Sequence, residues 1–135
     1  MTARAKVFEF AVVLDRDWNA ASDRGGALLS SADELAWTPE HLVLTGLARC
    51  SLTSLRYHCT RAGIELTSSA TARATVTRRE PDGRFAFAEV SVEAEIALDP
   101  KPAPDDLTAL LAKAERDCFV GASLTTQPRY DWTIG

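Results

Sequence analysis

The sequence contains few residues of the kinds that hold metals or covalent cross-links. Its 135 residues include three cysteines and two histidines, and no two cysteines form a CxxC pair. A zinc site normally needs four closely spaced Cys or His ligands, and a secreted disulfide framework needs several cysteine pairs. The composition therefore argues against a structural zinc site and a disulfide framework, and we expect no bound metal.

Long apolar runs and strong charge of one sign are also missing. No apolar segment approaches the ~20 residues that a membrane-spanning helix requires. The N-terminal residues, Met1 to Val7, lack the apolar core of a signal peptide. A net charge of −4 gives no general positive field for nucleic acid. We therefore expect a cytoplasmic protein that binds neither nucleic acid nor membrane.

The common motifs of nucleotide and hydrolase chemistry do not occur either. The sequence has no GxGxxG, P-loop or GxSxG segment and no internal repeat. Any chemistry is therefore most simply carried by the thiols of Cys50, Cys59 and Cys118.

The most informative segment that is present runs from Thr38 to Cys50. Thr38 is a good helix N-cap, Pro39 suits the first helical position, and Glu40 places negative charge at the positive end of the helix dipole. No further proline occurs before Gly63, which can end a helix. The pattern predicts a central helix from residue 39 to about 61, roughly 22 residues and about 33 Å long.

Strand patterns precede and follow this helix. We predict strands over residues 5–14, after the turn at 15–19, and over 27–31. Two alternating strands follow over residues 65–77 and 89–98, separated by the hairpin turn Pro81-Asp82-Gly83. Small inward residues on the first of these two strands suggest that the long helix lies against it.

The C-terminal part of the sequence predicts a second helix and a last strand. The helix covers about residues 105–117 and is ended or bent by Gly121, and the strand covers 130–134. The whole chain, residues 1–135, is then a single α+β domain with helices on one side of an antiparallel sheet.

The three cysteines are not equivalent in this scheme. Cys50 and Cys59 lie nine residues apart on one helix, so at about 100° per residue they point to opposite faces. Cys59 is most simply a small buried hydrophobe. Cys118 ends the apolar stripe of the second helix. Cys50 and Cys118 are therefore either two buried small residues, which spacing alone favours, or a pair that approaches disulfide distance.

The segment Thr38-Pro39-Glu40, with Leu42, Gly46-Leu47-Ala48 and Cys50, resembles the first signature of the OsmC/Ohr family of thiol peroxidases. That family has a Pro-Glu pair, a Leu/Ala-rich helical segment, a cysteine, and a second cysteine at the end of a later helix. Here Cys50 follows Glu40 by ten residues and Cys118 follows Cys50 by 68. The resemblance covers nearly the whole chain. It implies an OsmC-like fold, with antiparallel sheets packed around a long central helix and a second helix, in an intertwined homodimer.

The resemblance also implies a cysteine-based peroxidase that reduces organic hydroperoxides without a bound cofactor. Cys50 would attack the peroxide, and Cys118 would resolve the resulting sulfenic acid into a disulfide. An external dithiol, such as a lipoyl group, would then reduce that disulfide. Arg16, with Arg24 in reserve, matches the arginine that activates the thiolate. Glu40 matches the glutamate that holds this arginine by a bidentate salt bridge.

Glu40 and Cys50 are too far apart along one helix to serve a single site. Ten helical residues separate them by about 15 Å along the axis. Either the helix is interrupted, or Glu40 acts on Cys50 of a second chain. We predict the second arrangement, a two-fold homodimer with two sites that are each built from both chains.

Trp18, Trp37 and Phe119 are candidates to line an apolar substrate pocket, although each by itself is more typical of core or dimer packing. Such a pocket favours organic hydroperoxides over hydrogen peroxide, because it buries the alkyl tail. The family's usual Cys-Pro-x-Ser reads Cys118-Phe119-Val120-Gly121 here. The alternative is therefore a non-peroxidase member that binds a small hydrophobic ligand or senses oxidants. A third option is a purely structural dimerisation module.

Overall fold

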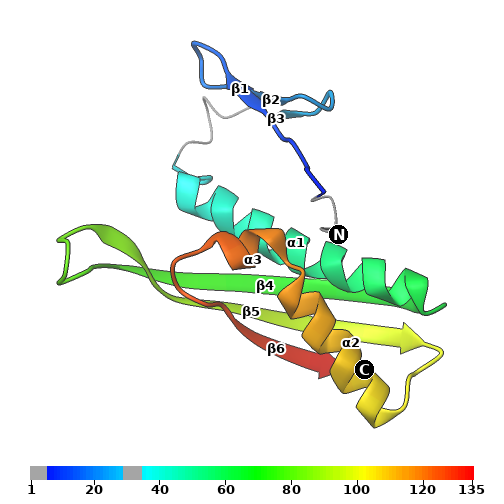
Figure 1. The fold of residues 1–135 in the computed structure, drawn as a ribbon. Helices are drawn as coiled ribbons and strands as arrows, with labels where there is room; N and C mark the ends of the chain where they lie inside the picture. The colour runs from blue at the N-terminus through cyan, green and yellow to red at the C-terminus, as the bar shows by residue number, and fades with distance from the viewer. Residues whose placement is uncertain (1–5, 29–34) are drawn as a thin grey trace, which may run out of the picture. The chain divides into compact units, whose positions relative to one another are not determined.

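The computed structural model describes residues 6–28 and 35–135. The chain divides into two compact units, residues 1–40 and 41–135, and each is described by itself. The first unit contains three short strands, β1 (Val12–Leu14), β2 (Ala20–Ser22) and β3 (Ala27–Leu28). They pair in that order as an antiparallel sheet (Figure 1).

The predicted first strand is wrong in length. Of the described residues 6–14, only Val12–Leu14 form a strand, because the partner strand β2 offers three residues for pairing before the chain turns again. The turn between them is confirmed: the Asp15 carboxylate accepts hydrogen bonds from the backbone amides of Asp17 and Asn19, both at 2.9 Å. Residue 5 and residues 29–31 of the predicted third strand lie outside the described residues.

The predicted long helix is confirmed as α1 (Pro39–Arg61), which has 23 residues. Gly63 ends it with a φ of 72°, a conformation that glycine adopts without steric cost. The amide of Gly63 donates to the carbonyl of Thr60, and the amide of Ile64 donates to the carbonyl of Cys59. These two bonds form the Schellman motif that satisfies the last carbonyls of a helix.

The second unit contains a three-stranded sheet of β4 (Glu65–Arg78), β5 (Phe85–Asp99) and β6 (Arg129–Ile134), in that order. The predicted hairpin of β4 and β5 is confirmed. The α+β fold class is confirmed, but the predicted antiparallel pairing does not extend to β6, which pairs parallel to β5. Helices α2 and α3 connect β5 to β6. A helical crossover of this kind lets the second strand run in the same direction as the first.

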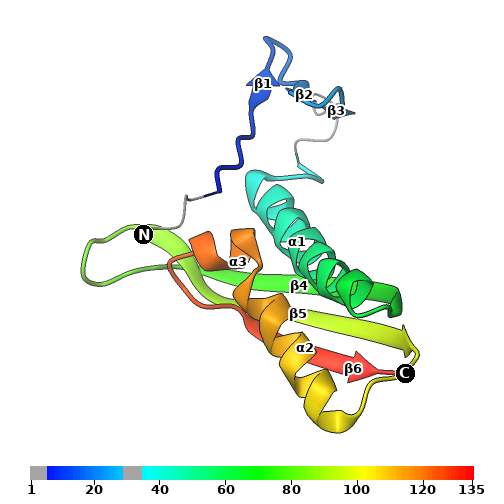
Figure 2. The same ribbon diagram turned by 45° about the vertical axis from the view of Figure 1, so that its right-hand side comes forward.

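Two further helices follow β5: α2 (Pro104–Arg116) and α3 (Phe119–Ser123). The prediction that Gly121 ends or bends α2 is wrong. Gly121 lies inside α3, which begins after the N-cap residue Cys118. Helices α1 and α2 lie on the same face of the sheet (Figures 1 and 2). No helix in the described ranges is long and apolar enough to cross a membrane.

The core between helices and sheet has two clusters. One is built around the buried residues Leu55, Cys59, Ile96 and Leu110. The other contains Leu47, Val90, Val92 and Cys118, and the small residues Ala70, Ala72 and Ala74 of β4 pack against it. The small side chains of β4 therefore do lie beside the long helix, as their pattern predicted.

Candidate functional site

The structure brings Cys50 and Cys118 together. Cys50 lies on α1 and is partly exposed, whereas Cys118 lies at the junction of α2 and α3 and is 0% exposed. A hydrogen bond joins the side chains of Cys50 and Cys118, and it raises the pKa of Cys50. Both cysteines are in the free thiol form. Two sulfurs from distant parts of the chain thus face each other, one of them reachable from solvent.

Cys59 is separate from this pair. It is 0% exposed and belongs to the other core cluster, with Leu55 and Ile96. Burial raises the pKa of its thiol, which keeps it protonated and unreactive. The prediction that Cys59 is a small buried hydrophobe is confirmed.

The pKa of Cys50 reflects opposing effects. Burial raises it most, and the neighbouring Cys118 raises it further, whereas the backbone amides of Val120 and Phe119 hydrogen-bond the sulfur and lower it. The net direction is upward from the ordinary value. The largest of these effects come from burial, the neighbouring thiol and two backbone amides. The second unit therefore supplies amide donors to a Cys50 thiolate.

The buried Cys118 sulfur is surrounded by polar groups. The backbone amide of Gly121 donates to it at 3.4 Å, and the Ser51 hydroxyl oxygen lies 3.6 Å away. Ser51 is buried and donates its own proton to the carbonyl of Leu47 at 2.8 Å. The Tyr130 hydroxyl completes this setting through hydrogen bonds with Cys118 and Ser51.

Gly121 makes this close approach possible. A methyl group at its α-carbon would lie 2.6 Å from the Tyr130 hydroxyl oxygen and 3.3 Å from the Cys118 sulfur. Contacts as short as the first do not occur in folded proteins, so only glycine fits without displacing a neighbour. The glycine is therefore required by the site and not by the end of a helix.

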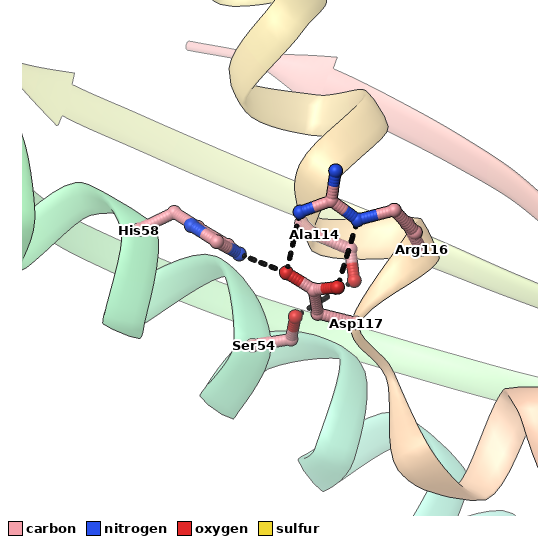
Figure 3. Close-up of polar contacts among 5 residues, drawn as sticks. All are labelled: Ser54, His58, Ala114, Arg116 and Asp117. Carbon is pink, nitrogen blue, oxygen red and sulfur yellow. Dashed lines mark hydrogen bonds and ion pairs between the residues drawn. The ribbon is translucent and has the colours of Figure 1, made fainter. Parts of the chain in front are cut away.

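A polar contact between α1 and the end of α2 fixes the segment that precedes Cys118. The His58 Nε2 atom lies 2.7 Å from an oxygen of Asp117, and the Arg116 guanidinium binds the same carboxylate with two hydrogen bonds (Figure 3). One turn earlier on α1, the Ser54 hydroxyl donates to the carbonyl of Ala114 at 2.8 Å. These bonds hold the chain next to Cys118 against the long helix.

The remaining predicted site residues are placed as follows. Phe119 directly follows Cys118 and is 53% exposed. Arg16 lies in the β1–β2 turn of the first unit and is exposed, and the Arg24 guanidinium lies 5.0 Å from the centre of the Phe10 ring. Glu40 is exposed in the first turn of α1. Trp18 and Trp37 also belong to the first unit, so the roles of these residues at the thiol pair stay predictions.

One alternative for Glu40 is excluded. Helix α1 is continuous from Pro39 to Arg61, so no interruption shortens the separation of about 15 Å along the axis between Glu40 and Cys50.

The sequence interpretation missed Ser51, Gly121 and Tyr130 as members of the site. Tyr130 is brought to Cys118 by the parallel register of the sheet, in which it pairs with Val92, and no spacing in the sequence indicates this. Among the described residues, no group of three or more His, Cys, Asp or Glu could hold a metal ion.

Comparisons with known proteins agree with this architecture. A family model described as OsmC-like protein matches residues 31–133. No curated protein matches the sequence.

Several solved structures are similar in fold. An OsmC-like protein of unknown function from Vibrio cholerae has a TM-score of 0.76 at 14% identity, covering 93% of this chain and 99% of that one. An organic hydroperoxide resistance protein from Elizabethkingia anophelis has a TM-score of 0.63 at 19% identity, covering 98% and 99%. The organic hydroperoxide resistance protein OhrB of Bacillus subtilis has a TM-score of 0.55 at 18% identity, covering 94% and 96%. At these identities the likeness shows the fold alone.

Proposed function

Because this chain belongs to the OsmC-like protein family, we propose that it is a thiol-dependent peroxidase that reduces organic hydroperoxides. The observation that carries the proposal is the contact between a partly exposed Cys50 and a fully buried Cys118. An accessible thiol next to a protected one is the arrangement that a two-cysteine reduction needs. Two proteins of similar fold are organic hydroperoxide resistance proteins, and this supports the choice of substrate class.

The reaction has two chemical steps at these sulfurs. The Cys50 thiolate attacks the outer oxygen of the hydroperoxide, the O–O bond breaks, and the alkoxide leaves and takes a proton, so that Cys50 becomes a sulfenic acid. The Cys118 sulfur then attacks the Cys50 sulfur. The S–S bond forms, the S–O bond breaks, and the departing hydroxide leaves as water with the Cys118 proton. An external dithiol, such as a lipoyl group, reduces the disulfide.

The first step needs a positive charge, because burial raises the pKa of the Cys50 thiol. We assign this charge to Arg16, oriented by Glu40 through a salt bridge. Arg24 remains the reserve candidate, but its stacking over Phe10 already engages its guanidinium.

We propose further that the active form is a homodimer with shared sites. Since α1 is continuous, Glu40 acts on Cys50 of the second chain. Exposed apolar residues of the first unit support the dimer, because a soluble protein normally covers such side chains. These include Val7 at 76% exposed, Phe10 at 66% and Val12 at 69%. A sheet of strands this short also needs a packing partner for its stability.

The apolar substrate pocket would be lined by Trp18, Trp37 and Phe119 in this dimer, and the protein would act in the cytoplasm without a bound cofactor. Burial of an alkyl tail against these rings adds binding energy that hydrogen peroxide lacks. We therefore expect a lower KM for cumene hydroperoxide than for hydrogen peroxide.

Steady-state consumption of cumene hydroperoxide with a dithiol tests the function. The wild type should turn over and lose two thiols per chain after one equivalent of peroxide, and Cys50→Ser should be inactive. Cys118→Ser should accumulate a sulfenic acid that dimedone traps. The matched control is Cys59→Ala, which removes a thiol from the other core cluster and should keep turnover. Arg16→Lys should lose far more activity than Arg24→Lys.

The raised pKa of Cys50 favours one rival function. A mostly protonated thiol suits a protein that binds a small hydrophobic molecule or reacts slowly as an oxidant sensor. That rival predicts stoichiometric oxidation at most, with no sustained turnover in the presence of excess dithiol. A wild type that fails to turn over while Cys50 stays reduced would refute the peroxidase proposal.

A further inference from the structure

We propose that Tyr130 is the hydrogen-bond donor that activates Cys118 for disulfide formation, with Gly121 as the residue that admits it. This inference deepens the proposed function and rests on it, because it assigns to Cys118 the second step of that reaction. It concerns the step that follows attack on the oxidant.

The geometry places the Tyr130 hydroxyl against a sulfur that no solvent reaches. Cys118 is 0% exposed, so water cannot stabilise its thiolate. A β-carbon placed on Gly121 would lie 2.6 Å from the Tyr130 hydroxyl oxygen and 3.3 Å from the Cys118 sulfur. The hydroxyl and the sulfur therefore lie next to the same small space. The Gly121 amide donates to the same sulfur at 3.4 Å. One hydroxyl and one amide thus converge on Cys118.

The proton assignment in this cluster follows from its hydrogen bonds. The Ser51 hydroxyl donates to the Leu47 carbonyl, and its oxygen lies 3.6 Å from the Cys118 sulfur. The Cys118 sulfur accepts from the Gly121 amide and from the Tyr130 hydroxyl, whose pKa this contact raises, as expected when a hydroxyl donates to sulfur. Burial and the contact with Cys118 raise the pKa of Tyr130 well above its ordinary value, so the hydroxyl keeps its proton and stays a donor.

This arrangement suits the second step. As the S–S bond forms and the S–O bond of the Cys50 sulfenic acid breaks, the Cys118 proton moves to the departing hydroxide, giving water. Negative charge develops on the Cys118 sulfur as it loses that proton. The Tyr130 and Gly121 donors stabilise this charge, in the way that fixed dipoles act in a site without water. Tyr130 is neither oxidised nor deprotonated in the step.

The test compares Tyr130→Phe with Tyr57→Phe. The chain has two tyrosines, and Tyr57 is 56% exposed on α1, which makes it the matched control. Single-turnover oxidation with cumene hydroperoxide is followed by quenching into dimedone and by counting thiols. This separates the formation of the Cys50 sulfenic acid from its conversion to the disulfide.

We expect Tyr130→Phe to form the sulfenic acid at the wild-type rate and to convert it about tenfold more slowly, the size of effect of one lost hydrogen bond. Tyr57→Phe should match the wild type in both steps. Unchanged conversion in Tyr130→Phe would overturn the inference, and so would an equal slowing of both steps.

A second oxidant keeps this test independent of the peroxidase proposal. If hydroperoxide leaves Cys50 reduced, the proposed function fails. Diamide, which accepts two electrons and two protons and becomes a hydrazine, then drives formation of the same disulfide through an adduct on Cys50. Slower displacement of that adduct in Tyr130→Phe supports the role of Tyr130, and an unchanged rate refutes it.

Discussion

The hydroxyl oxygen of Tyr130 occupies the space that a side chain at Gly121 would need. A β-carbon at position 121 would lie 2.6 Å from that oxygen. The two residues come from α3 and β6, so their relationship exists only in the folded chain, and it leads to the first prediction.

Gly121→Ala should destabilise the protein by about 1–3 kcal/mol, the usual cost of forcing extra volume into a packed site. Because the closest contact is to the Tyr130 hydroxyl, Tyr130→Phe should relieve much of that cost. Urea unfolding of both single variants and of the double variant measures the coupling. Costs that simply add would show that the hydroxyl does not restrict position 121.

Phe119→Pro should raise the pKa of Cys50. The Phe119 amide lowers this pKa by hydrogen bonding to the sulfur, and proline has no amide proton to give. The substitution fits the backbone, since Phe119 opens α3 and Cys118 before it is extended, with φ −77° and ψ 104°.

The measurement is the rate of Cys50 alkylation by iodoacetamide as a function of pH, with the modified peptide identified by mass spectrometry. Phe119→Leu keeps the amide and is the control. A profile for Phe119→Pro that overlays the control would show that this amide has no effect on the thiolate.

Asp117→Asn should remove an acid-dependent part of the stability. Arg116 first, and then His58, lower the pKa of Asp117 from 3.8 to about 2. A carboxyl group whose folded pKa is depressed stabilises the fold above its unfolded pKa, and this contribution is lost as pH falls through the folded value. The wild type should therefore exceed Asp117→Asn in stability at pH 7, with a gap that narrows between about pH 4 and pH 2.

Urea midpoints at several pH values measure this gap, and Asp131→Asn, on an exposed strand position, is the control. Since 38% of the Asp117 side chain is exposed, solvent screening keeps the effect modest. A gap that stays constant over the whole range would show that the pairing does not shift this carboxyl.

A mixed dimer tests the shared site. When a Glu40→Gln chain pairs with a Cys50→Ser chain, one of the two sites regains both Glu40 and Cys50 if the sites are built across chains. That mixed dimer should show about half of the wild-type activity, although both parent homodimers are impaired. Differently tagged chains, purified together and assayed for peroxide turnover, provide the measurement. Activity at or below the mean of the two parent homodimers would show that Glu40 of one chain and Cys50 of the other do not form one site.

Local patterns were sufficient for most of the second unit. Pro39 and Gly63 delimited α1 almost to the residue, because these signals act through the backbone of their own neighbours. The alternation in β4 and β5 likewise identified their buried faces. The strand over residues 5–14 was overestimated, because an apolar run does not show how much partner strand is available. The parallel direction of β6 depended on the path of the crossover.

The sequence by itself determined α1, α2 and the hairpin, and it indicated that Cys59 is a buried hydrophobe. Each of these follows from spacing along one element, whereas the choice of Cys50 and Cys118 as the reactive thiols came from the family resemblance. Only the tertiary structure decided that the two sulfurs meet, that Ser51, Gly121 and Tyr130 surround Cys118, and that Cys50 is the more exposed of the pair. Those contacts join α1, α3 and β6, and contacts between distant elements depend on how helices pack on a sheet, which no local pattern encodes.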